Sequence, residues 1–174
     1  MYYIDKVTNK QISQKDQIKY NPYFMIQALE EARKAQECDE VPIGAVIVKN
    51  DIIVAKGFNQ CIKLLDPTAH AEIVALRKAT KKMQNYRLNN CSIYVTIEPC
   101  IMCVGALVNS RIKNIFFGAL NIKYGACESA FKIANNKKLN HQIEVFGGNF
   151  KCLSEKCSIL LRTFFCKKRK KIKI

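Results

Sequence analysis

The chain has 174 residues, of which 49% are hydrophobic and only four are proline, so it can bury one sizeable core and is too apolar for extensive disorder. It has no run of about eighteen apolar residues, which argues against a membrane-spanning helix, and its first twenty residues do not resemble a secretory signal, so we expect a soluble, cytoplasmic protein. The net charge of +15 favours a polyanionic partner, although a composition rich in lysine could produce this excess without a function.

The first half of the chain is expected to hold a helix, a hairpin and a second helix. Asn21 followed by Pro22 is typical of a helix start, and two short apolar runs on either side of Lys49-Asn50-Asp51 are typical of a hairpin. The expected segments are a helix over residues 21–37, strands over 43–48 and 52–55, a loop over 59–67 and a helix from about 68 to 82.

In the second half, strands and helices alternate, which predicts an α/β fold: a mixed sheet with helices on both faces. The expected segments are strands over 92–97, 114–118 and 143–146 and helices over 100–109, 129–135 and 153–168, the last with Ile159, Leu160, Thr163 and Phe164 turned inward. We divide the chain into an N-terminal extension (1–20), one domain (21–166) and a basic tail (167–174), because six of the last eight residues are Lys or Arg.

Nine cysteines, an odd number without regular spacing, favour free thiols and a metal site over disulfides. Only Cys100 and Cys103 have a spacing that carries chemistry, because residues three apart share one face of a helix. Pro99 suits a helix start, and the N-terminus of a helix favours thiolate over thiol. A C-x-x-C pair alone is also typical of redox sites and structural zinc sites, so it needs a further ligand to be informative.

His70 supplies that ligand, and Glu72 follows it by two residues. In mid-helix these two side chains would point about 200° apart, so both reach one ion only from a first helical turn. Zinc held by three protein ligands keeps a fourth position open for a water, whose protons Glu72 is placed to handle. The spacing matches the H-x-E…P-C-x-x-C signature of zinc nucleobase deaminases. We expect the second histidine, His141, to be structural.

Beyond these motifs, the chain closely resembles the bacterial-type tRNA-specific adenosine deaminases of the cytidine/deoxycytidylate deaminase superfamily. The matching segments are residues 41–46, 66–73, 84–88, 94–100, 102–103, 105–106, 110–112 and 117–119. Weaker similarity extends the resemblance to about residues 20–165. It implies a cytidine-deaminase-like, three-layer fold with a five-stranded sheet, one Zn²⁺ per subunit, a homodimer, and conversion of adenosine to inosine at the tRNA wobble position.

The resemblance also implies roles for single residues. The implied zinc ligands are His70, Cys100 and Cys103, with Glu72 as the proton shuttle. The implied contacts to the substrate, a tRNA anticodon stem-loop, are Asn59, the backbone of Ala71, Ile97, Asn121, Phe165 and Arg169. Of the basic residues of the last helix, Arg162, Lys168 and Arg169 are expected to follow the phosphates. Asn121 and Tyr124 depart from the Asp and Thr that are usual in the family at these two positions; these differences leave the zinc chemistry intact and bear on RNA contacts and selectivity.

Two alternatives remain open. A deaminase of the same fold that acts on a free base, nucleoside or nucleotide, such as cytosine, guanine or deoxycytidylate, would share the zinc site, but it would not require the basic last helix. A nucleic-acid-binding protein with a structural zinc would need a fourth protein ligand, for which Cys91 or Cys127 are candidates. This second alternative leaves Glu72 without a role.

Overall fold

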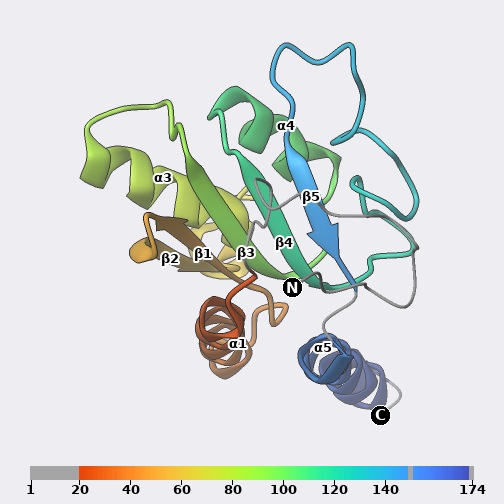
Figure 1. Ribbon diagram of the computed structural model, residues 1–174. Coiled ribbons are helices and arrows are strands. Elements are labelled where there is room, and N and C mark those ends of the chain that lie inside the picture. The colour runs from red at the N-terminus through yellow and green to blue at the C-terminus, as the bar shows by residue number, and fades with distance from the viewer. Residues whose placement is uncertain (1–19, 149–150, 173–174) are drawn as a thin grey trace, which may run out of the picture.

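Five strands form one mixed sheet in the order β2-β1-β3-β4-β5 (Figure 1) in a computed structural model that describes residues 20–148 and 151–172. The strands are β1 (Gly44–Lys49), β2 (Ile52–Phe58), β3 (Cys91–Ile97), β4 (Asn114–Ala119) and β5 (Glu144–Gly147). β1 pairs antiparallel with β2 and β3, whereas β3, β4 and β5 run parallel to one another. The parallel half brings the carboxyl ends of β3 and β4 to one edge, which is where open α/β sheets bind their ligands.

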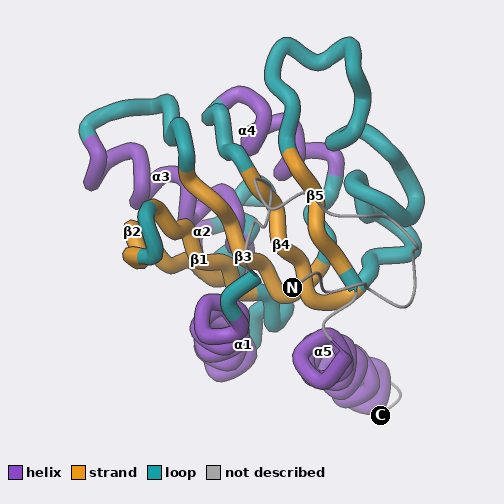
Figure 2. Tube along the Cα trace, in the orientation of Figure 1, coloured by secondary structure: helices purple, strands orange, loops and turns teal. Residues whose placement is uncertain are grey.

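Helices cover both faces of the sheet (Figure 2). They are α1 (Pro22–Glu37), α2 (Cys61–Leu64), α3 (Ala71–Met83), α4 (Ile101–Asn109) and α5 (Lys151–Ile172). α1 and α5 pack on one face, and α3 and α4 pack on the other, so the predicted three-layer α/β architecture is confirmed. Among the helices of the described part of the chain, none is long and apolar enough to cross a membrane.

The central strands are apolar on both faces because each face is covered by helices. Alternate residues of β3 point to opposite sides, so Ile93 and Val95 pack toward α3 and α4, whereas Tyr94 packs toward α1 and α5. The Tyr94 ring stacks on Phe116 at 4.5 Å, and Phe116 stacks on Phe146 at 5.0 Å. This aromatic row ties the three parallel strands together on the α1/α5 face.

The predicted start of α1 and the hairpin are confirmed. The Asn21 side chain accepts a hydrogen bond from the Tyr23 amide at 3.0 Å, and Pro22 is the first helical residue. The next helix begins later than expected, at Ala71, and the short helix α2 lies inside the segment expected to be a loop. α4 likewise begins one residue after Cys100, which is its N-cap.

In the C-terminal third, one expectation is wrong and another holds only in part. Residues 129–135 are not helical, because the amides at the start of this segment donate to the Glu98 carboxylate and later amides turn back to Gly125 and Ala126. In α5, Phe164 is buried and Leu160 packs partly buried on the core, as expected, but Ile159 is 49% exposed and Thr163 is exposed. α5 continues through residue 166 to Ile172, so part of the basic tail is helical.

Candidate metal centre

Three side chains with metal-ligating atoms converge where α3 and α4 begin. Nδ1 of His70 lies 3.7 Å from Sγ of Cys100 and 3.5 Å from Sγ of Cys103. Tetrahedral zinc, with bonds of about 2.3 Å to sulfur and 2.0 Å to nitrogen, places its ligand atoms about 3.3–3.8 Å apart. Within the described residues, no other group of three His, Cys, Asp or Glu side chains is placed to hold a metal ion. The donor set and its spacing therefore fit zinc.

Both helices present their N-termini to this position. His70 is the N-cap of α3, and its carbonyl accepts the Val74 amide at 2.9 Å. Cys100 is the N-cap of α4, its carbonyl accepts the Val104 amide at 2.9 Å, and Cys103 follows in the first turn. Unpaired amides and the helix dipole make such ends favourable for thiolates. The expectation that all the ligands lie at helix starts is confirmed.

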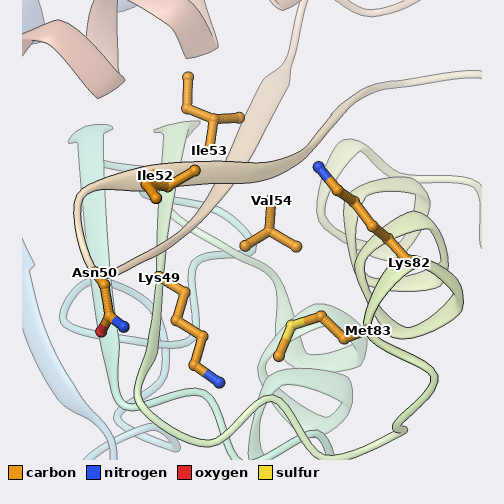
Figure 3. A pocket seen from close by; sticks show the side chains of 7 residues that line it. All are labelled: Lys49, Asn50, Ile52, Ile53, Val54, Lys82 and Met83. Atoms are coloured by element: carbon orange, nitrogen blue, oxygen red, sulfur yellow. The ribbon is translucent and has the colours of Figure 1, made fainter.

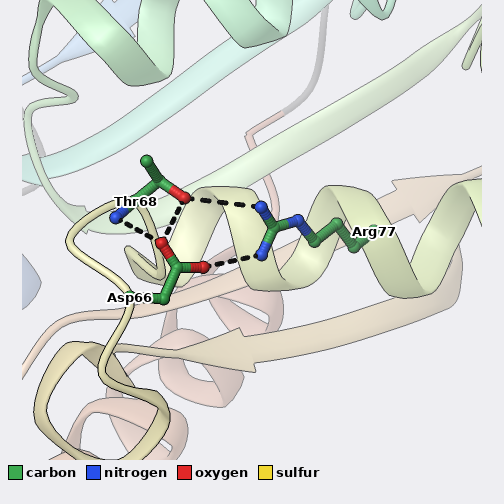
Figure 4. Close-up of polar contacts among 3 residues, drawn as sticks. All are labelled: Asp66, Thr68 and Arg77. Atoms are coloured by element: carbon green, nitrogen blue, oxygen red, sulfur yellow. Dashed lines mark hydrogen bonds and ion pairs between the residues drawn. The ribbon is translucent and has the colours of Figure 1, made fainter.

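The turn that carries His70 is braced by three side chains (Figure 4). Asp66 Oδ1 accepts hydrogen bonds from the Thr68 amide at 2.8 Å and from the Thr68 hydroxyl at 2.6 Å. Asp66 Oδ2 pairs with the Arg77 guanidinium at 3.1 Å, and Arg77 also donates to the Thr68 hydroxyl at 3.4 Å. Because Arg77 belongs to α3, this cluster fixes the turn to the helix that it precedes.

Glu72 lies in the first turn of α3 and is only 3% exposed. Burial raises the pKa of its carboxyl above the usual value, and the charge of His70 opposes this rise only in part. A raised pKa makes the carboxylate a stronger proton acceptor than an exposed one, which favours a role in general acid–base catalysis. Its side chain also hydrogen-bonds with Cys103, so it lies directly beside the ligand set.

The two thiols differ in protonation. A hydrogen bond from Cys103, opposed by burial and aided by His70, lowers the pKa of Cys100 to about 4. The same bond, together with burial, raises the pKa of Cys103. A hydrogen bond with Cys100 also raises the pKa of His70. These directions favour the thiolate at Cys100 and the thiol at Cys103, and binding of zinc by both sulfurs requires the loss of the remaining proton.

Asn59 and Ala71, both expected to contact the substrate, are hydrogen-bonded to each other. Asn59 is 4% exposed, and its Oδ1 accepts the Ala71 amide at 2.8 Å. The Ala71 amide is thus already engaged, and only the amino group of the Asn59 side chain can serve as a donor to a ligand. Ile97, at the end of β3, is 8% exposed. It belongs to neither of the two hydrophobic clusters that fill the two faces of the sheet, which agrees with a place in a pocket wall.

The other expected contacts lie farther along the chain. The Asn121 amide donates to Glu98 Oε2 at 3.0 Å, and Asn121 Oδ1 accepts the Tyr124 amide at 3.2 Å. Phe165 is 43% exposed and Arg169 is also exposed, but both belong to α5, which packs on the opposite face of the sheet from α3 and α4. The structure therefore does not bring Phe165 and Arg169 together with the metal ligands.

Three further predictions concern a fourth zinc ligand, His141 and Lys168. Cys91 and Cys127 are buried and do not join the metal-ligand group, so among the described residues the structure offers no fourth protein ligand. His141 Nε2 is hydrogen-bonded with the Ile112 carbonyl at 2.6 Å, as expected of a structural histidine. Lys168, predicted to follow the RNA phosphates, forms an ion pair with Asp39 at 2.5 Å in the structure.

Sequence reasoning missed Glu98, which is 1% exposed and stands two residues before Cys100. Burial alone would raise its pKa, but hydrogen bonds from Glu128, Ser129 and Asn121 outweigh burial and lower it below the usual value. Its position in the sequence could have revealed it, because Glu98 lies between an apolar strand and a metal ligand and is therefore expected to be buried. A buried carboxylate needs several hydrogen-bond donors.

A groove of about 330 Å³ lies at the other end of α3 (Figure 3). It is lined by Lys49, Asn50, Ile52, Ile53, Val54, Lys82 and Met83. The rise of α3 separates Lys82 from the metal ligands by about 17 Å, so this groove is not part of the metal centre.

Comparison with known proteins agrees with this geometry. Residues 18–119 match the family described as the cytidine and deoxycytidylate deaminase zinc-binding region. The tRNA-specific adenosine deaminase of Haemophilus influenzae is 48% identical over 156 residues, which cover 89% of this chain and 88% of the relative. The corresponding enzyme of Aquifex aeolicus is 45% identical over 150 residues, which cover 86% of this chain and 97% of the relative.

Two solved structures of deaminases share this fold. A chain from a study of A-to-I editing by tRNA:A34 deaminases at the wobble position of transfer RNA superposes with a TM-score of 0.74 at 39% identity. That alignment covers 79% of this chain and 99% of the other. A guanine deaminase from Bacillus subtilis, also 39% identical, gives a TM-score of 0.56 and covers 59% of this chain and 66% of that enzyme.

Proposed function

The chain belongs to the tRNA-specific adenosine deaminases of the zinc-dependent cytidine and deoxycytidylate deaminase family, and we propose that it hydrolyses adenosine to inosine at the wobble position of tRNA anticodons. The observation that carries this function is a group of three metal ligands with a buried carboxyl beside it. Adenosine and one water give inosine and ammonia.

Proton transfer is the role we assign to Glu72. His70, Cys100 and Cys103 would hold zinc, which would supply an acidified water as the nucleophile. Glu72 takes one proton from the attacking water and passes it to the ring nitrogen of adenine. It then moves the second proton of that water, from the hydroxyl group now on the ring carbon, to the amino group that departs as ammonia. Its raised pKa suits both directions of this transfer, because the carboxyl must accept a proton and give it up within one turnover.

The nucleoside is held, in this proposal, by groups at the start of α3 and the end of β3. Because Asn59 Oδ1 is occupied by the Ala71 amide, its amino group is the donor that we assign to the nucleoside. Ile97 provides an apolar wall. The wobble base must leave the anticodon loop to enter, and a loop base is already partly unstacked, which lowers the cost of extrusion relative to a duplex.

We assign the RNA backbone to the basic surface of the chain. The exposed basic residues of α5 include Arg162, Lys167, Arg169 and Lys170. Phe165 adds an exposed aromatic ring to the same helix. Because α5 and the metal ligands lie on opposite faces of the sheet, contacts at α5 would bind the stem of a folded RNA or its flanking nucleotides while the wobble base enters the site. Asn121, near the site, would contact the nucleotides closest to the base.

A homodimer and a cytoplasmic location complete the proposal. The loop after β4 exposes two large apolar side chains, Leu120 and Ile122, at 48% and 78%. Such side chains close together are typical of an interaction surface. Sedimentation equilibrium of the zinc-loaded protein should give twice the mass of one chain, and a single-chain mass at micromolar concentration would rule the dimer out.

The deciding experiment is inosine formation on an anticodon stem-loop with adenosine at the wobble position, compared with free adenosine, cytidine, deoxycytidylate and guanine. We expect inosine in the stem-loop alone. Turnover of a free base, nucleoside or nucleotide and none of the stem-loop would retain the hydrolytic chemistry and reject tRNA as the substrate.

A further inference from the structure

Glu98 is a buried carboxylate between β3 and the metal ligand Cys100. It is 1% exposed, and the groups that neutralise it are hydrogen-bond donors of the segment that follows β4. A charge taken out of water at this depth is costly unless it is fully hydrogen-bonded. The arrangement around Glu98 therefore needs an explanation beyond the packing of β3.

Five donors from one loop bind this carboxylate. Oε1 accepts the amides of Cys127, Glu128 and Ser129 at 3.0, 2.7 and 3.0 Å. Oε2 accepts the Asn121 amide at 3.0 Å and the Ser129 hydroxyl at 2.5 Å. Both ends of the loop from residue 121 to residue 129 are thus tied to one side chain. We call this segment the 121–129 loop.

The middle of the 121–129 loop lies against the metal ligand itself. Gly125 forms a β-bridge with Cys100, and the Ala126 amide donates to the Pro99 carbonyl at 2.8 Å. Gly125 also packs tightly on Glu98, since a Cβ atom there would lie 2.2 Å from Oε2. Glu98 and Cys100 are two residues apart, so the same short segment fixes the 121–129 loop and one metal ligand.

We propose that Glu98 is a positioning residue that holds the 121–129 loop at the metal centre as the wall that receives the RNA next to the reacting nucleoside. This inference rests on the proposed tRNA function. The loop offers the half-buried Asn121 and the exposed ring of Tyr124 to the substrate; Glu98 accepts the Asn121 amide, and the Asn121 side chain in turn accepts the Tyr124 amide. Glu98 acts through the loop and does not touch the reacting atoms, so its loss should impair binding of the RNA more than the chemical step.

Glu98→Gln is the direct test, because it keeps the shape of the side chain and replaces one acceptor oxygen by an amino group. At the Oε2 position that amino group would face the Asn121 amide, so at least this hydrogen bond should break, whereas the Ser129 hydroxyl can accept from the amino group. Glu30→Gln is the matched control, since it makes the same change at an exposed side chain of α1, outside the loop and the metal centre.

Three readouts separate positioning from a general structural role. For Glu98→Gln we expect an unchanged zinc-to-protein ratio, a KM for the stem-loop raised about tenfold or more with kcat within about threefold, and amide hydrogen exchange at least about tenfold faster at residue 121. Glu30→Gln should match the wild type in all three. Unchanged KM and exchange would overturn the proposal, and so would loss of zinc in proportion to loss of activity.

Ser129→Ala keeps the proposal testable if Glu98→Gln does not fold, because it removes one of the five donors of Glu98, and with it the contact of the same hydroxyl with the Asn121 carbonyl at 2.7 Å, and leaves four donors. It should accelerate exchange at Asn121 and raise KM at least about twofold; wild-type values would overturn the proposal. Loop exchange is measured on the zinc-loaded protein without RNA, so it tests the anchoring even if the wild type proves inactive on the stem-loop. Inactivity of the wild type would count against the proposed function, whereas wild-type exchange in both variants would count against the role of Glu98.

Discussion

Glu72 combines a buried carboxyl with a place in the first turn of α3, beside the three metal ligands. Glu72→Ala should retain zinc and lose turnover of the stem-loop by about 10²–10⁴-fold, because a general acid–base group typically contributes that much. Zinc content by metal analysis and single-turnover inosine formation measure the two effects. Glu30→Ala, at an exposed position of α1, is the control. Activity within tenfold of the wild type would reject the proton-transfer role.

Asn59 is tied to stability as well as to the substrate, through its bond to the Ala71 amide. Asn59→Ala leaves that buried amide without its acceptor, so the free energy of unfolding should fall by about 1–3 kcal/mol. Urea denaturation of the zinc-loaded protein measures this loss. Asn135→Ala, at an exposed loop position, should change the free energy by less than about 0.5 kcal/mol. Equal stability of both variants would show that the bond to Ala71 contributes nothing.

At the residue scale, the metal ligands could be predicted from the sequence, whereas the hydrogen bonds of a buried carboxylate could not. His70, Cys100 and Cys103 were predicted because metal ligation needs particular residue types at particular spacings, and the structure brings these three together. Glu98 was missed because a buried carboxylate is recognised by its donors, which are backbone amides some thirty residues away. Backbone amides carry no residue-type signal.

The turn before α3 is the element on which the position of His70 depends. Hydrogen bonds from Thr68, and then from Arg77, lower the pKa of Asp66 below its usual value. Asp66→Ala removes the acceptor for both partners, so the turn loosens and zinc affinity, measured by competition with a chelator, should fall about tenfold or more, as for other residues that orient metal ligands. Glu37→Ala, an exposed carboxylate at the end of α1, should leave the affinity unchanged.

The same lowered pKa predicts a pH dependence of stability. A carboxyl whose pKa is lower in the folded state stabilises that state above the unfolded value of about 4, and this contribution is lost as the pH falls through the folded pKa. The stability difference between wild type and Asp66→Ala should therefore be constant above about pH 5 and shrink below pH 4. Acid titrations of both proteins, followed by circular dichroism in urea, measure it. A difference that persists unchanged to pH 2 would contradict the ionic role of Asp66.

Element boundaries show where sequence patterns stop being informative. The start of α1 was predicted because its signals, Asn21 and Pro22, act on neighbouring residues. The helix expected over residues 129–135 does not form because Glu98 and the carbonyls of Gly125 and Ala126 take the amides that a helix would need. A competitor that is distant in sequence decides this segment, and local propensity cannot reveal it.

At the scale of the whole molecule, the layer architecture followed from the alternation of strands and helices, because a sheet flanked by helices on both sides is the packing available to such a chain. The net charge of +15 has no such unique interpretation. The positions of the basic side chains say more about an RNA-binding surface than the net charge does. Lys168 pairs with Asp39, whereas Arg162 and Arg169 are exposed on α5.

Replacing Arg162 and Arg169 with Gln should therefore weaken stem-loop binding and reduce the slope of log K against log salt by about two, one unit for each phosphate that the protein no longer neutralises. Zinc content should not change. Lys49→Gln with Lys82→Gln is the control of equal charge, because these lysines line the groove at the far end of α3 (Figure 3). Binding measured from 50 to 300 mM salt distinguishes a located interaction from overall charge. If the two double variants lose affinity equally, α5 is not the RNA-binding element and the basic charge acts only through its total.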